Sequence, residues 1–325
     1  MSFALAPDTH AILAAAAAKS AQFPFQTWLP DAMEAPSPIS ALIHAATMVN
    51  AGVYLLARFY PAFKDVPGWT LSVMIVGMLS ALMAALMALV ANDLKRVLAY
   101  STVSQLGYMV YAVGAGGILA SQFHLLSHSV FKALLFLAAG AVIHSVGTRD
   151  MREMGGLGKE LPFARTVFVI GSFALAGIPI FNGFWSKELI LEAGLEHGNL
   201  IWIYVIMLIV AGLTALYTTR CVWMVFYGEK KLDRHIHLIG RNMKIALIPL
   251  TIGAFSTWIL IGPFSKMMSS SLPVHLIQNI DLLALFNHVV FAPATWIALA
   301  IIALGVMTWF SRAALTGIQK ALKPI

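Results

Sequence analysis

Cysteine and charged side chains are the residues this sequence has least of. Its 325 residues include a single cysteine, Cys221, and only 11% of them are charged. One cysteine can form neither a disulfide within the chain nor a cluster of thiolate metal ligands. Soluble domains usually carry about 25% charged residues. The composition therefore argues against a soluble domain, and we expect no metal site and no iron–sulfur centre.

Motifs that bind phosphates or redox cofactors are also missing from the sequence. It contains no glycine-rich phosphate loop and no Cys-x-x-Cys pair, so no nucleotide or flavin site is recognisable. The first ten residues, MSFALAPDTH, have no basic segment, and Asp8 and His10 interrupt their apolar run. Such a start does not predict a cleavable signal peptide. We expect a chain that binds no cofactor of its own.

Long apolar segments make up most of the chain. Hydrophobic residues account for 60% of it, and its mean hydropathy is +0.83. A helix needs about 20 apolar residues to cross a bilayer, and segments such as 71–91 and 201–219 meet that requirement. The sequence therefore predicts an all-α integral membrane protein with about nine transmembrane helices, two of them broken. The predicted spans are residues 9–29, 39–58, 70–91, 97–117, 119–144, 163–195, 200–227, 242–262 and 293–311.

The net charge of +7 is distributed unevenly about these spans. Arg58, Lys64 and Lys266 fall on one side, and a much larger basic group falls on the other. Cytoplasmic loops of membrane proteins are enriched in lysine and arginine. We therefore predict a multi-pass protein of the cell inner (plasma) membrane with its N-terminus outside and its C-terminus in the cytoplasm. No nucleic acid is needed to explain the basic excess. The larger group is Lys95, Arg96, Arg149, Arg152, Lys159, Arg165, Arg220, Lys230, Lys231, Arg234, Arg241, Lys244, Arg312, Lys320 and Lys323.

Three lysines, Lys19, Lys132 and Lys187, remain inside predicted spans. A charge at the bilayer centre costs about 2.5–3.5 kcal/mol on insertion scales. A lysine near a helix end can instead extend its amine to the interface, and this alternative is stronger for Lys19 and Lys187 than for Lys132. Otherwise such lysines face a protein interior or a hydrated cavity.

Lys19 and Lys187 each lie close to a predicted helix break. Lys19 precedes Pro24, and Lys187 follows Pro179. Proline removes a backbone donor and clashes with the preceding turn of a helix. Non-helical backbone at membrane depth occurs only where it is buried in protein or lines water. Paired broken helices of this kind are typical of ion-coupled transporters.

The segment SQFHLLSHSVFK places three titratable groups on one helical face. His124, His128 and Lys132 are four residues apart, so their side chains lie one above the other. Groups with neighbouring pKa values can pass protons in small steps, and burial lowers a lysine pKa toward that of histidine. His44 also lies in a predicted span, where it is either a hydrogen-bonded packing residue or a member of the same relay.

Acidic residues are scarce in the predicted membrane region. Of the 14 Asp and Glu residues, only Glu188 and Glu192 lie within a span and away from its edges. Both could equally face the outer aqueous edge of a half-helix. Lys19 has no evident carboxylate partner in the sequence. We therefore expect a second polypeptide to supply one.

Five sequence blocks resemble, in the same order, the antiporter-like subunits of respiratory complex I, and most of all their large distal member. The resemblance covers about residues 10–228, and the Mrp cation/proton antiporters and membrane-bound hydrogenases share most of these motifs. The blocks are KSAQFPFQTWLPDAMEAPSPISALIHAATMVNAGVYLLARF, NDLKRVLAYSTVSQLGYM, FHLLSHSVFKALLFLAAGAVIH, GTRDMREMGGLG and GIPIFNGFWSKELIL.

The resemblance implies proton-carrying roles at matching positions. Lys19 would be the lysine of the first broken helix, which in the family couples to a glutamate two helices earlier. Lys132 would be the central lysine, and Lys187 the terminal lysine that faces an outward exit, with Glu188 as its acidic neighbour. The connecting histidines would be His44, His124 and His128.

Members of the resembled family normally contain two inverted five-helix repeats and a long lateral helix. The resemblance here begins near the second repeat, so it implies a companion subunit that supplies the first repeat and its glutamate. A truncated start is the alternative, but it would leave buried charge unbalanced. We divide the chain into residues 1–228, the second repeat and following helix, and residues 229–325, which hold the C-terminal membrane helices. Within the latter, residues 272–291 are expected to form an amphipathic helix on the outer surface, and a tenth span is the alternative.

Three functions are compatible with these features. The leading hypothesis is a proton-translocating subunit of a redox-driven, complex I-like NADH/quinone oxidoreductase, with other antiporter-like and redox subunits as partners and no redox chemistry in this chain. The second is a subunit of a cation/proton antiporter of the Mrp kind or of a membrane-bound hydrogenase. The third is a structural half-subunit that conducts no ions.

Overall fold

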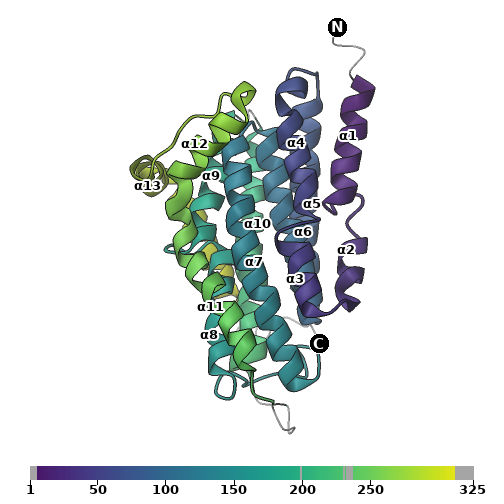
Figure 1. The fold of residues 1–325 in the computed structure, drawn as a ribbon, viewed down its shortest axis with the longest axis vertical. Helices are drawn as coiled ribbons and strands as arrows, with labels where there is room; N and C mark the ends of the chain where they lie inside the picture. The colour runs from purple at the N-terminus through teal and green to yellow at the C-terminus, as the bar shows by residue number, and fades with distance from the viewer. Residues whose placement is uncertain (1–5, 198–199, 230, 232–236, 312–325) are drawn as a thin grey trace, which may run out of the picture.

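Helices form the entire fold of the described residues, which are 6–197, 200–229, 231 and 237–311 in the computed structural model (Figure 1). The only strand-like feature in these ranges is a single bridge between Asp93 and Asp150. The prediction of an all-α membrane protein is confirmed. The elements are α1 (Ala6–Lys19), α2 (Trp28–Asp31), η1 (Ala32–Glu34), α3 (Ser37–Ala45), α4 (Asn50–Phe63), α5 (Trp69–Val90), α6 (Leu94–Gly114), α7 (Ile118–Val146), α8 (Pro162–Ala176), α9 (Asn182–His197), α10 (Ile201–Val222), the π-helical η2 (Trp223–Tyr227), α11 (Arg241–Ser256), η3 (Thr257–Leu260), α12 (Ile261–Ser271), η4 (Pro273–His275), α13 (Leu282–Phe291) and α14 (Pro293–Phe310).

Each of the nine predicted spans contains a helix of the structure. By length and apolar composition, six helical segments within the described ranges could cross a membrane. The other predicted spans correspond to shorter or more polar helices, such as α8 with 15 residues. The six segments are Ser37–Phe63, Trp69–Val90, Ile118–Val146, Ile201–Tyr227, Arg241–Ser271 and Pro293–Phe310.

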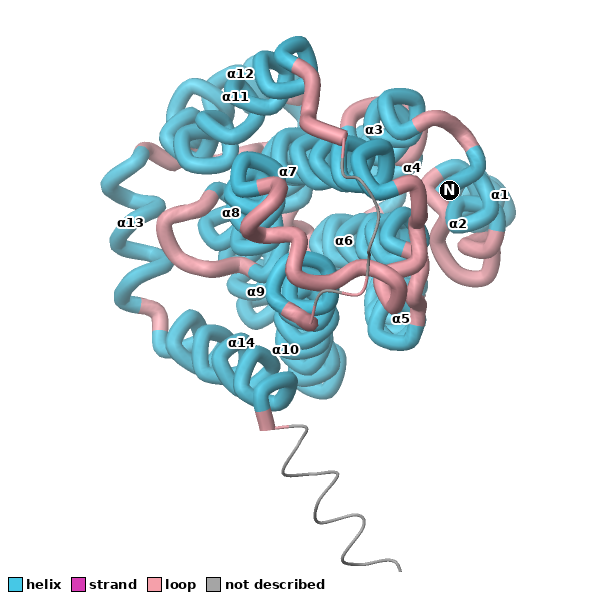
Figure 2. The backbone as a smooth tube through the Cα atoms, turned by 90° about the horizontal axis from the view of Figure 1, so that it is seen from below, coloured by secondary structure: helices cyan, strands magenta, loops and turns pink. Residues whose placement is uncertain are grey.

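The bundle surrounds α6 and α7. Viewed along the bundle, these two helices lie among the others, whereas α1 and α14 lie on the periphery (Figure 2). Nearly every residue of α6 is buried, although its sequence includes several hydroxyl and amide side chains. Buried polar groups need hydrogen-bond partners within the protein. The centre of the bundle therefore holds polar contacts rather than a purely apolar core.

The first predicted helix break lies between α1 and α2. α1 ends at Lys19, and residues 20–27 are not helical. The Ser20 hydroxyl donates to the Val49 carbonyl oxygen at 2.6 Å, and the Gln22 amide donates to the Val103 carbonyl oxygen of α6 at 3.4 Å. These contacts attach the break to neighbouring segments. Within the break, the Phe23 backbone N–H donates to the Ser80 hydroxyl of α5 at 2.9 Å, so backbone exposed by the break finds a partner inside the protein, as membrane burial requires.

The second predicted break separates α8 from α9. α8 ends at Ala176, and Gly177 takes a left-handed conformation with φ of 84°, which glycine adopts without the steric cost of a side chain. Pro179 follows, and α9 begins at Asn182, whose amide donates to the Ser127 carbonyl oxygen of α7 at 3.2 Å. This break is thereby attached to the helix that carries His124 and Lys132.

A third interruption, between α3 and α4, was not predicted. The sequence favoured one continuous span over residues 39–58, whereas residues 46–49 are not helical. The Asn50 amide donates to the Ala45 carbonyl oxygen, at the end of α3, at 2.8 Å. No proline or glycine marks residues 46–49, and the interruption is stabilised by side chains outside it. Local sequence signals could not have revealed it.

Small residues bring α5 and α6 into close contact. A Cβ atom placed on Gly107 would lie 2.6 Å from the Gly77 carbonyl oxygen and 2.7 Å from the Ala81 nitrogen. Such close backbone approach is a common basis of helix association in membranes, where the hydrophobic effect contributes little. Packing against α5 therefore fixes the position of the polar helix α6.

α13 lies transversely at the side of the bundle instead of running along it. Figure 1 shows it end-on beside the upright helices, and Figure 2 shows it lengthwise between α12 and α14. Its 10 residues span about 15 Å, half the thickness of the hydrocarbon core. This geometry favours the surface helix over a tenth span, but the helix covers only part of the predicted 272–291.

Candidate functional site

The predicted stripe on α7 faces the protein interior. His124, His128 and Lys132 are each 0% exposed. The two imidazole centroids lie 6.4 Å apart, and Lys132 Nζ donates to the Ser101 hydroxyl of α6 at 2.7 Å. Lys132 therefore does not extend to a membrane interface, and the stripe lies against the polar centre of the bundle.

His124 connects α6, α7 and α9. Its Nε2 lies 3.2 Å from the Gln105 side-chain oxygen, and its Nδ1 lies 2.9 Å from the Ser186 hydroxyl. A neutral ring can donate from Nε2 to Gln105 and accept from Ser186, whereas a protonated ring donates at both nitrogens. The Ser186 hydroxyl is also 3.0 Å from the Asn182 carbonyl oxygen, so it can donate there when the ring is protonated.

Lys187 is buried at the break between α8 and α9. It is 1% exposed, and its Nζ donates to the Leu175 carbonyl oxygen, in the last turn of α8, at 2.9 Å. The amine also lies 5.5 Å from the centroid of the Tyr108 ring. A helix C-terminus and an aromatic face both favour a cation. The break therefore provides a polar site for a lysine deep in the bundle.

Acidic residues follow Lys187 along α9. Glu188 is 4% exposed and interacts with Thr295 of α14 and with Lys187. One turn further, a Glu192 carboxylate oxygen lies 3.1 Å from Nδ1 of His288 of α13. Ionisable side chains thus occur on α7 and at successive turns of α9.

His44 joins this set from α3. It is 0% exposed, and its ring lies 5.0 Å from that of Phe136 on α7, one turn beyond Lys132. Neither ring nitrogen of His44 or of His128 has a hydrogen-bond partner among the described protein atoms. Buried imidazoles of this kind are normally partnered by ordered water.

Lys19 is separate from the other predicted residues. It is exposed on α1, which packs mainly against α4 and α5. No carboxylate of the described residues lies within 4.0 Å of its amine. The structure therefore brings together six of the seven predicted residues and leaves Lys19 on the surface.

Several members of the site were not predicted individually. Ser101, Gln105 and Tyr108 on α6 contact the lysines and His124, and Ser186 on α9 contacts His124. The available signal was the run STVSQLGY within an otherwise apolar helix. The pairing of Glu192 with His288 had no local signal because the two residues are 96 positions apart.

Metal ligands are not clustered in the described parts of the chain. No group of three or more His, Cys, Asp or Glu side chains there could hold a metal ion. The buried ionisable residues instead contact hydroxyl and amide groups: Lys132 contacts Ser101, and His124 contacts Gln105 and Ser186.

Comparisons with known proteins identify the family of the chain. Residues 6–214 match the family described as NADH:quinone oxidoreductase/Mrp antiporter, TM. The chain is 52% identical over 221 residues to NAD(P)H-quinone oxidoreductase chain 5 of Picosynechococcus sp., covering 65% of this chain and 33% of that protein. It is 48% identical over 253 residues to F(420)H(2) dehydrogenase subunit L of Methanosarcina mazei, covering 73% of this chain and 37% of that protein.

A solved structure has the same fold. A chain of the Mrp complex from Dietzia sp. superposes with a TM-score of 0.81 and 31% identity, over 97% of this chain and 35% of that chain. This chain thus spans 33–37% of the length of the three proteins compared. The predicted resemblance is confirmed, since the matching family covers most of the sequence. The chain is a multi-pass membrane protein that belongs to the NADH:quinone oxidoreductase/Mrp antiporter transmembrane family.

Proposed function

We propose that this chain is a proton-translocating subunit of a redox-driven membrane complex. The observation that supports this most directly is the buried line of titratable groups from His44 and Lys132 to Lys187 and Glu188. Ionisable residues inside a membrane protein are costly and mark ion or proton pathways. The line contains more basic groups than carboxylates. A set of structural ion pairs would instead need equal numbers of opposite charges.

His124 has the geometry of the central relay. A neutral ring that carries its proton on Nε2 can take a second proton at Nδ1 from the side of Ser186 and the neighbouring Lys187, and the resulting imidazolium can release a proton from either nitrogen. The contacts of 3.2 Å and 2.9 Å at the two nitrogens support this exchange. The same imidazole can therefore accept on one side and donate on the other without moving its ring.

The charge of the lysines couples neighbouring steps. Lys132 and Lys187 lie close enough to interact electrostatically, and such interaction is strong in a low-dielectric interior. A proton on one amine disfavours a proton on the other. A change of charge at one end of the line would thus be transmitted along it, with the driving energy supplied by electron transfer in other subunits.

Lys19 would belong to the same system through a carboxylate outside residues 1–325. The exposed amine lies at the end of α1, beside a break that Ser20 and Gln22 attach to the bundle. A carboxylate on a companion chain or on a preceding segment would compensate this charge in the membrane. We assign redox subunits and other antiporter-like subunits as further partners, since the compared relatives are named as parts of oxidoreductases.

The orientation follows from the charge distribution. The proposed outer end of the bundle carries Arg58, Lys64 and Lys266, and the opposite end carries most other basic residues. The positive-inside rule then assigns the N-terminus to the outside of a cell inner membrane and the C-terminus to the cytoplasm. The division into residues 1–228 and 229–325 remains a prediction.

Replacing Lys132 tests the proposal. In inverted membrane vesicles carrying the assembled complex, Lys132→Ala is expected to abolish proton pumping while the complex still assembles. Lys64→Ala, which removes an exposed lysine at the outer end, serves as the matched control and should pump normally. Unchanged pumping by an assembled Lys132→Ala complex would reject the relay and favour a structural role.

A cation/proton antiporter of the Mrp kind is the second candidate. The superposition with the Mrp complex over 97% of this chain favours it. Purification of the native complex distinguishes the two functions. Co-purifying redox subunits support the redox-driven pump, and their absence together with exchange driven by an imposed ion gradient supports the antiporter.

A further inference from the structure

Three carboxylates lead from Lys187 to the end of α9. Glu188, Glu192 and Glu196 are spaced by four residues, so they lie on one face of the helix. Their burial decreases in order: Glu188 is 4% exposed, the Glu192 side chain is 25% exposed, and Glu196 is exposed. The three residues form a graded path from the buried line to the surface.

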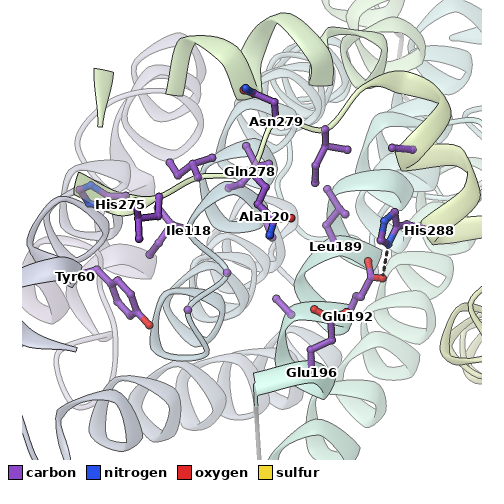
Figure 3. A pocket seen from close by; sticks show the side chains of 18 residues that line it. Tyr60, Ile118, Ala120, Leu189, Glu192, Glu196, His275, Gln278, Asn279 and His288 are labelled. Carbon is purple, nitrogen blue, oxygen red and sulfur yellow. Dashed lines mark hydrogen bonds and ion pairs between the residues drawn. The ribbon is translucent and has the colours of Figure 1, made fainter. Parts of the chain in front are cut away.

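This path ends in a cavity of about 560 Å³. Glu192 and Glu196 line one wall, and Tyr60 of α4 and His275 of η4 line another (Figure 3). The cavity is large enough for many water molecules, since one occupies about 30 Å³ in the liquid. It lies at the end of the bundle that the proposed orientation assigns to the outside.

His288 of α13 brings a second titratable group to the same wall. Its Nδ1 lies 3.1 Å from a Glu192 carboxylate oxygen, and its side chain is 56% exposed (Figure 3). The charged or titratable groups near this pair are Glu188 and Glu196 on α9, and Tyr60 and His275 across the cavity. The pair of Glu192 and His288 is therefore part of the path from the interior and is also exposed to solvent.

We propose that Glu192, His288 and Glu196 form the port through which protons carried by Lys187 and Glu188 exchange with the outer aqueous phase. The port rests on the proposed function and extends it to residues on α13. A proton leaves the Lys187 ammonium, which becomes a neutral amine, and binds a carboxylate oxygen of Glu188. It then passes to Glu192, and from there to His288 or Glu196 and to cavity water, so no bond other than those to the proton changes.

The residue types suit this task. Carboxyl and imidazole groups are the side chains that most often accept and release protons in proteins. A carboxylate and an imidazole in contact can also share a proton until the next group on the path can exchange it. The transverse position of α13 keeps the imidazole at the cavity wall.

The port can be tested in the assembled complex with four variants and two chemical rescues. Glu192→Gln keeps the size of the side chain and removes its charge, and His288→Ala removes the imidazole. Asp281→Ala is the structural control because Asp281 caps α13 through the Ala284 nitrogen at 2.7 Å without belonging to the port. Lys187→Ala tests the proposed function itself.

We expect Glu192→Gln and His288→Ala to reduce the rate of proton pumping several-fold, and Asp281→Ala to retain most of it. Added imidazole should restore His288→Ala, and added formate should restore Glu192→Gln, because small diffusible acids can replace a surface group. Lys187→Ala should be inactive and not restored by either compound.

The outcomes separate the two proposals. Inactive Lys187→Ala with normal pumping by both Glu192→Gln and His288→Ala would overturn the port and leave the relay intact. Normal pumping by Lys187→Ala would overturn the proposed function. Slow pumping by His288→Ala that imidazole does not restore, together with equally slow Asp281→Ala, would show a structural role for α13 and overturn the port.

Discussion

The Ser186 hydroxyl lies 2.9 Å from His124 Nδ1, and Ser186 directly precedes Lys187 in α9. This contact joins the side chains of the α7 stripe to the helix of the terminal lysine. The Ser186 hydroxyl can also donate to the Asn182 carbonyl oxygen in the first turn of α9. In the proposed relay, transfer between the two halves of the line would pass through this hydroxyl.

Ser186→Ala should slow proton pumping and weaken the fold only slightly. The variant removes one hydrogen bond of about 1 kcal/mol and leaves His124 Nδ1 without its protein partner. Pumping by the assembled complex and thermal unfolding should be measured together, and Ser186→Thr, which keeps the hydroxyl, should restore the rate. Equal pumping by Ser186→Ala and the unmodified chain would show that protons bypass this contact.

The helices and the α7 stripe were predictable because their signals are local. Apolar length predicted the membrane helices, Pro24 and Pro179 predicted two breaks, and spacing by four predicted that His124 and Lys132 share a face. Each of these features depends on residues within two or three turns of one another.

The interruption between α3 and α4 and the pairing of Glu192 with His288 were not predictable. The first depends on the Ser20 and Asn50 side chains, which partner the backbone around residues 46–49. The second depends on α13 folding back across the bundle. The contacts of Ser20 with Val49 and of His288 with Glu192 join segments far apart in the sequence, and neither segment contains a local sign of its partner.

Gly107→Ala should destabilise the contact between α5 and α6. The added methyl would lie within 2.6 Å of the Gly77 carbonyl oxygen, so the backbones must separate, at a cost of about 1–3 kcal/mol. Thermal unfolding in detergent should show a lower midpoint. Gly228→Ala is the control, since its new methyl would meet only ordinary contacts of 3.5 Å or more. An unchanged midpoint for Gly107→Ala would contradict the close packing.

Glu34→Gln should remove part of the acid sensitivity of the fold. At the basic end of the bundle, the Arg149 guanidinium hydrogen-bonds the Glu34 carboxylate at 3.1 Å and holds the pKa of that carboxyl below its ordinary value of 4.5. A depressed carboxyl pKa stabilises the fold above pH 4.5, and the stabilisation disappears as pH falls through the lower folded-state pKa.

The expected result is therefore a smaller loss of thermal stability between pH 5 and pH 3 in Glu34→Gln than in the unmodified chain. Glu229→Gln is the control, because it removes the same charge from another exposed glutamate. Identical pH profiles for Glu34→Gln and the unmodified chain would show that the pair with Arg149 contributes nothing in solution, as exposed ion pairs often do.

Lys19→Ala should affect assembly and not the stability of this chain. The Lys19 side chain is exposed and has no carboxylate of the described residues within 4.0 Å, so its removal should change thermal stability of the isolated chain by less than about 0.5 kcal/mol. In the complex, a partner carboxylate would be left buried and unpaired, which costs about 3–5 kcal/mol. Co-purification with companion chains should fall for Lys19→Ala and remain normal for Lys64→Ala. Normal assembly and pumping by Lys19→Ala would mean that this amine faces headgroups or water in the membrane, and that the relay begins at His44.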